Sequence, residues 1–126
     1  MTAVWLLLAI LAAPAPSQAA TDPGARAFQR CSACHSLQAD EETGPRLDDV
    51  FGRRAGTAGG FVYSDAMKAA GRRGLVWDAP TLERFLADPE AVVPGTTMPY
   101  QGGSAAERRV LIDWLRRSKQ APRNRM

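Results

Sequence analysis

The chain of 126 residues has very few of the side chains that usually bind metals or perform acid–base catalysis. It contains one histidine and two cysteines, and all three lie within residues 31–35. A structural zinc site needs about four such ligands, so the sequence excludes one. No second histidine and no carboxylate cluster accompanies an acid–base partner, and we therefore expect that the protein is not an enzyme.

Long apolar runs are also scarce. The longest, residues 4–13, is shorter than the roughly 20 residues of a membrane-spanning helix. Small residues follow it at Ser17-Gln18-Ala19, which is typical of the cleavage site of a secretory signal peptide, although residues 1–3 carry no basic side chain. We predict a cleaved signal peptide at residues 1–19 and one mature domain at residues 20–126. A retained membrane anchor is the alternative.

The excess of positive charge is small. Sixteen basic and thirteen acidic residues leave a formal net charge of +3, which does not indicate nucleic-acid binding. Residues 104–126 hold seven basic side chains and two acidic ones. This local charge predicts a solvated helix face, or alternatively a docking patch for an acidic partner.

Patterns typical of β-strands are almost absent, since only residues 75–77 and 91–93 are rich in β-formers and both are too short for a sheet. Helical periodicity predicts about four helices: at about residues 22–34, after Ser64, from Asp78 to before Pro89, and from Ser104 onwards. Long Gly- and Pro-rich segments lie between them. The sequence therefore predicts an all-α fold whose long loops are organised by a bulky cofactor.

The last predicted helix has the clearest local signals. Ser104 and Glu107 have the spacing of a capping box. Asp113 and Arg117 are four residues apart, which predicts an ion pair along one face of the helix.

The segment Cys31-Ser32-Ala33-Cys34-His35 is a C-x-x-C-H motif, which is typical of covalent haem attachment. On a helical turn the two thiols face the same way, so both can bond to one edge of a porphyrin. His35 then becomes an axial ligand of the iron. A thioredoxin-like pair needs a βαβ context, and a simple disulfide would leave His35 unexplained. We predict one haem c, attached through Cys31 and Cys34.

A second axial ligand has to come from the methionines or lysines. The candidates are Met1, Met67, Met98, Met126, Lys68 and Lys119. Met98 stands in a loop with a proline at each end, Pro94 and Pro99, whereas a mid-helix methionine such as Met67 usually belongs to a core. We therefore predict Met98 as the second ligand, which leaves no open iron site for a substrate.

Together these segments resemble the class I cytochromes c, in particular the bacterial soluble group related to mitochondrial cytochrome c and cytochrome c2. The resemblance covers nearly all of the predicted mature domain. It implies the cytochrome c fold, wrapped round one haem, with the N- and C-terminal helices crossing near Gly24. It also implies that the Pro45 carbonyl accepts a hydrogen bond from His35. The further residues that it places at the haem, as partners of its propionates, are Arg53, Tyr63 and Trp77, and Thr96 is a donor either to a propionate or within the loop. Without the resemblance, the two aromatics indicate core packing and the arginine a surface charge.

The function that the resemblance implies is electron transfer in the bacterial periplasm, with the iron cycling between Fe(II) and Fe(III). We expect redox partner proteins, no nucleic-acid partner, no membrane span in the mature chain, and a monomer. Two alternatives stay open. One is a haem enzyme or ligand-binding cytochrome in which Met98 is labile, and the other is an electron-transfer subunit of a larger oxidoreductase. Only Lys68 and Lys119 could contribute lysines to a docking surface, so the family's lysine-ringed surface is not expected here.

Overall fold

Helices make up nearly all the regular structure in this computed structural model, which describes residues 12–17, 21–39, 43–100 and 102–120. The five helices in those ranges are α2 (Pro23–Phe28), α3 (Asp65–Arg72), α4 (Ala79–Ala87), α5 (Pro89–Val92) and α6 (Ala105–Gln120). The only β pairing in the same ranges is an isolated bridge between Arg54 and Val76. The predicted all-α fold is therefore confirmed, and α5 is added to the four predicted helices.

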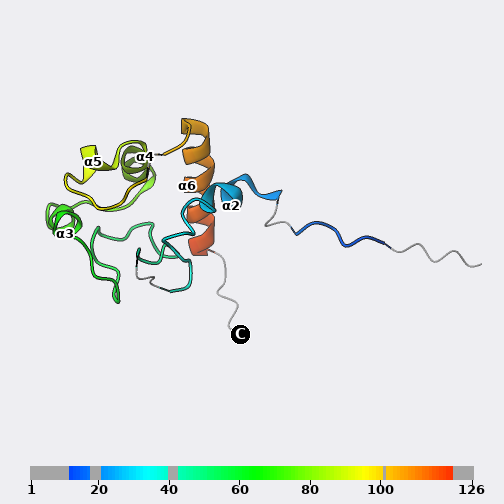
Figure 1. Cartoon of the computed structure of the whole chain (residues 1–126), viewed down its shortest axis with the longest axis horizontal. Coiled ribbons are helices and arrows are strands. Elements are labelled where there is room, and N and C mark those ends of the chain that lie inside the picture. The colour runs from blue at the N-terminus through cyan, green and yellow to red at the C-terminus, as the bar shows by residue number, and fades with distance from the viewer. Residues whose placement is uncertain (1–11, 18–20, 40–42, 101, 121–126) are drawn as a thin grey trace, which may run out of the picture.

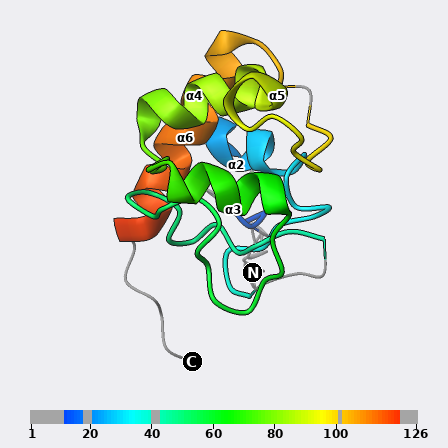
Figure 2. The ribbon, with the colours of Figure 1, turned by 90° about the vertical axis from the view of Figure 1, so that its left-hand side faces the viewer.

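Helix α6 is the longest helix of the described ranges, and α2 and α4 contact it. Figure 1 shows α2 crossing α6 near its middle, with α3, α4 and α5 to one side. In Figure 2 the segment between α2 and α3 forms the lower part of the molecule, below α3. No helix in the described ranges is long and apolar enough to cross a membrane. The predicted signal peptide, residues 1–19, lies largely outside those ranges, so its cleavage stays a prediction.

Side-chain caps begin all five helices, and those of α3, α4 and α6 lie where the sequence predicts these helices to start. Ser64 Oγ accepts a hydrogen bond from the backbone of α3 at 3.2 Å. Asp78 and Thr81 cap α4 reciprocally, with two side-chain to backbone hydrogen bonds of 2.8 Å. Ser104 and Glu107 cap α6 in the same way, at 3.2 and 3.1 Å. These bonds satisfy backbone N–H groups that have no partner within a helix, which fixes where each helix begins.

The first helix is shorter than its sequence predicts. Helix α2 ends at Phe28, and turns occupy residues 29–34. Ser32 N still donates to Phe28 O at 3.0 Å, and His35 N donates to Cys31 O at 2.8 Å. The prediction of a helix to residue 34 was therefore wrong in extent, but single helical turns do carry the C-x-x-C-H motif.

The crossing of α2 and α6 depends on a residue without a side chain. A Cβ at Gly24 would lie 2.7 Å from the Val110 carbonyl oxygen and would also meet the Trp114 side chain. The Phe28 and Trp114 rings pack beside this point, with centroids 4.9 Å apart. The predicted crossing of the N- and C-terminal helices is confirmed.

Helix α4 packs on α6 through an apolar face of each helix. Arg108 on α6 reinforces this contact by donating from Nε to Glu83 Oε1 at 2.8 Å, with only 15% of its side chain exposed. The buried residues on the two faces are Leu82, Phe85 and Leu86 on α4 and Leu111, Ile112 and Leu115 on α6. These faces form one side of the core, next to the loops that follow α2.

Ion pairing on α6 differs from the prediction. Asp113 pairs with Arg116, at 3.5 Å, instead of with Arg117. Arg117 reaches Asp22 at the start of α2, where its Nη1 donates to Oδ2 at 3.1 Å. The predicted pair within the helix was wrong because a tertiary partner is available to Arg117.

Asp22 is expected to make the folded protein less stable as the pH falls. The hydrogen bond from Arg117, and then that from Gly24 N, lowers the pKa of Asp22 below its usual value. As the pH falls, the Asp22 carboxylate of the unfolded chain therefore binds a proton at a higher pH than that of the folded protein does. The stabilisation is complete above the unfolded pKa of about 3.9 and is lost as the pH falls through the lower folded-state value. In acid unfolding, Asp22→Asn should show a shallower loss of stability than the parent below about pH 4. Parallel curves would contradict this expectation.

Candidate functional site

One apolar cavity brings together the residues that the sequence singles out. Its volume is about 280 Å³, and it lies between the segments after α2, the start of α3, helices α4 and α6, and the loop before α6. Every predicted site residue lines it: Cys31, Cys34, His35, Pro45, Arg53, Tyr63, Trp77, Thr96 and Met98. These residues come from five separate stretches of the chain, so the fold assembles the cavity from distant loops.

The two cysteines lie on a single turn at one end of this cavity. Cys34 N donates to Cys31 O at 3.0 Å, which closes the turn. Both thiols are free in the described structure. Burial raises the pKa of the Cys31 thiol to about 11.

His35 is oriented by a backbone carbonyl. Its Nδ1 lies 2.7 Å from Pro45 O, so Nδ1–H donates and Nε2 keeps a free lone pair for a metal. Burial lowers the pKa of His35, and although the bond to Pro45 opposes this, the Arg53 charge adds to it. A Cβ at Gly44 would lie 2.8 Å from His35 Nδ1, which explains a glycine before Pro45.

Met98 reaches the same cavity from the loop between α5 and α6. Its side chain is partly buried and packs against the core. Met98 N donates to Thr96 Oγ1 at 3.3 Å, so the hydroxyl of Thr96 is engaged within the loop. The other methionine in the cavity wall is Met67 on α3.

Arg53 is the one charged group of this wall with buried donors left over. Its Nη2 donates to Arg46 O at 2.9 Å. Its Nε and Nη1 are buried and have no hydrogen-bond partner among the described residues. Unpaired buried donors of a cation are costly, and a carboxylate is the group that best satisfies such a guanidinium.

The two aromatic candidates are held by contacts within the protein. Tyr63 Oη accepts a hydrogen bond from Ala58 N at 3.0 Å, and its ring meets Phe61 edge-on at 4.9 Å. Trp77 is 6% exposed and packs on Phe85, with centroids 5.0 Å apart. These contacts fix both side chains at the cavity wall.

Arg46 is a residue of this region that the sequence does not reveal. Its carbonyl holds Arg53, and its Nε lies 3.6 Å from Asp48 Oδ1. It follows Gly44-Pro45 in an irregular loop, where no periodicity indicates which side chains turn inward. The only available signal was its closeness in sequence to Pro45.

The donor set fits a haem c. Two thiols and an imidazole share one turn, the walls are largely apolar, and Arg53 offers unpaired donors for a carboxylate. These groups match the two vinyl positions, the iron, the porphyrin faces and a propionate of that cofactor.

No family model matches the chain, but known proteins do. It is 48% identical over 77 residues to cytochrome c2 iso-2 of Magnetospirillum fulvum, covering 60% of this chain and 77% of that protein. It is 40% identical over 98 residues to cytochrome c2 of Blastochloris viridis, covering 76% and 74%. Ferricytochrome c2 from Rhodopseudomonas palustris superposes with a TM-score of 0.72 at 32% identity, over 77% of this chain and 96% of that one. The chain belongs to the cytochrome c2 group of the class I cytochromes c.

Membership of this group confirms the predicted fold, the cofactor and the absence of enzyme activity. Cytochromes c2 are electron carriers with one covalent haem c, and Cys31 and Cys34 have the spacing for its attachment beside His35.

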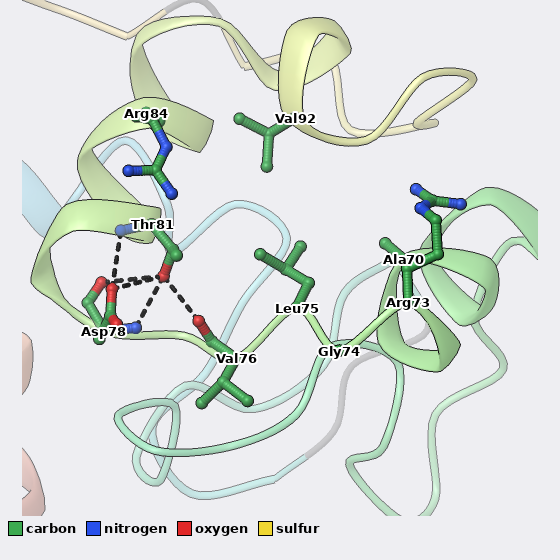
Figure 3. Close-up of a pocket in the computed structure, with 9 residues that line it drawn as sticks. All are labelled: Ala70, Arg73, Gly74, Leu75, Val76, Asp78, Thr81, Arg84 and Val92. Atoms are coloured by element: carbon green, nitrogen blue, oxygen red, sulfur yellow. Dashed lines mark hydrogen bonds between the residues drawn. The ribbon is translucent and has the colours of Figure 1, made fainter.

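A second hollow does not suit the cytochrome c2 cofactor. This groove of about 420 Å³ lies between the end of α3 and helices α4 and α5, and Figure 3 shows Arg73 and Arg84 on either side of Leu75. Asp78 and Thr81 on its wall are already engaged with each other in the cap of α4. Its lining includes no cysteine, histidine or methionine and shares no residue with the first cavity.

Replacing Arg53 is expected to lower the midpoint potential. Arg53→Leu removes a positive charge from the cavity wall, and loss of a nearby cation favours the ferric state. An interaction of about 1–2 kcal/mol at an effective dielectric constant near 20 corresponds to roughly 40–90 mV for one electron. Spectroelectrochemical titration of the holo-protein measures this. Arg53→Lys keeps the charge, so its midpoint potential should fall by less than that of Arg53→Leu. Equal midpoint potentials in the two variants would contradict this expectation.

Proposed function

We propose that this cytochrome c2 is an exported periplasmic electron carrier in which His35 and Met98 are the two axial ligands of the haem iron. The observation that carries the proposal is the orientation of His35. Its Nδ1 lies 2.7 Å from the Pro45 carbonyl oxygen, and Nε2 is thereby left to bind a metal in a cavity that Met98 also lines.

The bound haem supplies a one-electron change of its iron, and the protein sets the conditions for that change. Pro45 fixes the His35 tautomer and raises its basicity as a ligand. The thioether of Met98 is a soft donor that favours the ferrous state. Arg53 would hold a propionate, with Tyr63, Trp77 and Thr96 completing that side of the cavity. With His35 and Met98 both bound to the iron, a substrate would find no open coordination site.

Export and partners follow from the sequence and the family. We infer cleavage of residues 1–19, a mature domain of residues 20–126, and a monomer that meets redox partner proteins and no nucleic acid. Mass spectrometry of the mature N-terminus tests the cleavage. A retained N-terminal segment would contradict it, and stable co-purification with a dehydrogenase or oxidase would indicate a fixed subunit.

Replacing Met98 by alanine is the experiment that tests the ligation. We expect the variant to lose the weak red absorption band of methionine-bound ferric haem. Its potential should fall on the order of 100 mV, since axial ligands move haem potentials over about 0.8 V. Met67→Ala is the matched control, because Met67 lines the same cavity. A normal band and potential in Met98→Ala, or their loss in Met67→Ala alone, would remove Met98 from the iron.

A further inference from the structure

The loop that carries Met98 begins with a tight turn over residues 93–96. Thr96 N donates to Val93 O at 3.0 Å, and Gly95 has a φ of +84°. Proline at the second position and a glycine with positive φ at the third are the features of a type II turn. Such a turn uses only the N–H of its last residue, so the N–H of Gly95 is free to bond to an acceptor outside the turn.

Glu90 provides that acceptor. Its Oε1 accepts a hydrogen bond from Gly95 N at 3.0 Å. Glu90 lies on α5, whose first turn is capped by Asp88 Oδ1 through a hydrogen bond of 3.3 Å from Ala91 N. The side chain of Glu90 forms no ion pair within the described residues. Its carboxylate is thus committed to the turn.

This turn also fixes the backbone of Met98. Thr96, the last residue of the turn, accepts a hydrogen bond on Oγ1 from Met98 N at 3.3 Å. The turn also lies against α3, because a Cβ at Gly95 would be 3.5 Å from the Ala66 Cβ. A chain of two side-chain hydrogen bonds therefore connects Glu90, through the turn, to the residue whose thioether enters the cavity.

We propose that Glu90 is a positioning residue for Met98: its carboxylate locks the turn and so keeps the thioether on the iron in competition with other ligands. This inference rests on the proposed ligation by Met98. A glutamate at this place acts through loop geometry and touches neither the haem nor the iron. Its loss should loosen the methionine without changing the attachment at Cys31 and Cys34.

Titration of the ferric holo-protein with imidazole tests the proposal. Binding is monitored by the loss of the methionine-dependent red band. We expect Glu90→Ala to bind imidazole about three- to tenfold more tightly than the parent, the range that loss of one net hydrogen bond gives. Glu90→Gln keeps an oxygen that can accept from Gly95 N and should bind imidazole as the parent does. Asp113→Ala removes the same charge from the exposed face of α6 and serves as the control.

The outcomes separate this inference from the proposed function. If the parent lacks the red band, the ligation by Met98 fails and the inference fails with it. If the parent has the band and Glu90→Ala binds imidazole like the parent or like Asp113→Ala, only the role of Glu90 is overturned. An equal gain in imidazole affinity in Glu90→Gln and Glu90→Ala also overturns it, because the hydrogen bond to Gly95 N would then not be the cause.

Discussion

A Gly24→Ala variant is expected to be less stable than the parent by about 2 kcal/mol, even though alanine favours helices. The methyl group would gain about 1 kcal/mol of helix propensity. It would also lie 2.7 Å from the Val110 carbonyl oxygen, in a helix backbone that cannot turn away as a flexible side chain can. Relieving that clash requires α2 and α6 to separate, which also opens the contact between Phe28 and Trp114.

Guanidinium unfolding of the ferric holo-protein measures this difference. Gly59→Ala is the matched control, because a Cβ at Gly59 would meet no atom within 4 Å and its φ is not positive. That variant should lie within about 0.5 kcal/mol of the parent. Equal stability of the two variants would contradict the close contact between α2 and α6 at Gly24.

The parts of the fold that the sequence predicted are those that depend on local signals. Ser64, Asp78 and Ser104 cap the helices whose starts they predict, because a cap needs only the next three residues. Helix α5 was not predicted, since a four-residue helix between two longer segments is too short to have a period. The end of α2 was misplaced because the C-x-x-C-H turns keep helical hydrogen bonds without continuing the helix.

The site residues that could be predicted from the sequence are mainly those that lie in short continuous motifs. The C-x-x-C-H motif and the loop that carries Met98 between two prolines are each a short continuous segment of the sequence. The family resemblance supplied Pro45 and Arg53. Arg46 was missed because its role comes from a loop that folds back, and no sequence spacing reports that. Glu90 was missed for a related reason, since its partner Gly95 belongs to a turn whose geometry appears only in three dimensions.

The basic C-terminal segment shows how tertiary contacts change the meaning of a charge pattern. Arg117 pairs with Asp22, and Lys119 donates to Phe51 O at 2.7 Å while lying 3.7 Å from Asp49 Oδ1. Arg116 also covers the Phe51 ring, at 5.2 Å from its centroid. Arg117 ties α6 to the start of α2, and Arg116 and Lys119 tie it to the loop that follows α2, so less of the segment's charge is available to dock an acidic partner. Residues 121–126 lie outside the described ranges.

Replacing His35 by alanine is expected to abolish the normal low-spin cytochrome. His35 is the only histidine of the chain, so no other imidazole can take its place on the iron. The hydrogen bond from Nδ1 to Pro45 O disappears with it, so the loop at residues 44–46 loses one of its contacts with the C-x-x-C-H turn. We expect the yield of holo-protein to fall at least about tenfold, because the iron would lack the imidazole that holds it against the C-x-x-C-H turn.

Two measurements distinguish haem attachment from axial ligation in this variant: haem staining after denaturing electrophoresis, and the absorption spectrum of the reduced protein. Staining reports attachment through Cys31 and Cys34, whereas the spectrum reports axial ligation. Any attached haem in His35→Ala should become low-spin again when imidazole is added, because the added base fills the position that Nε2 held. Gln38→Ala, at an exposed position three residues away, should behave like the parent. A normal low-spin spectrum in His35→Ala without added imidazole would refute the assignment of His35 as the proximal ligand.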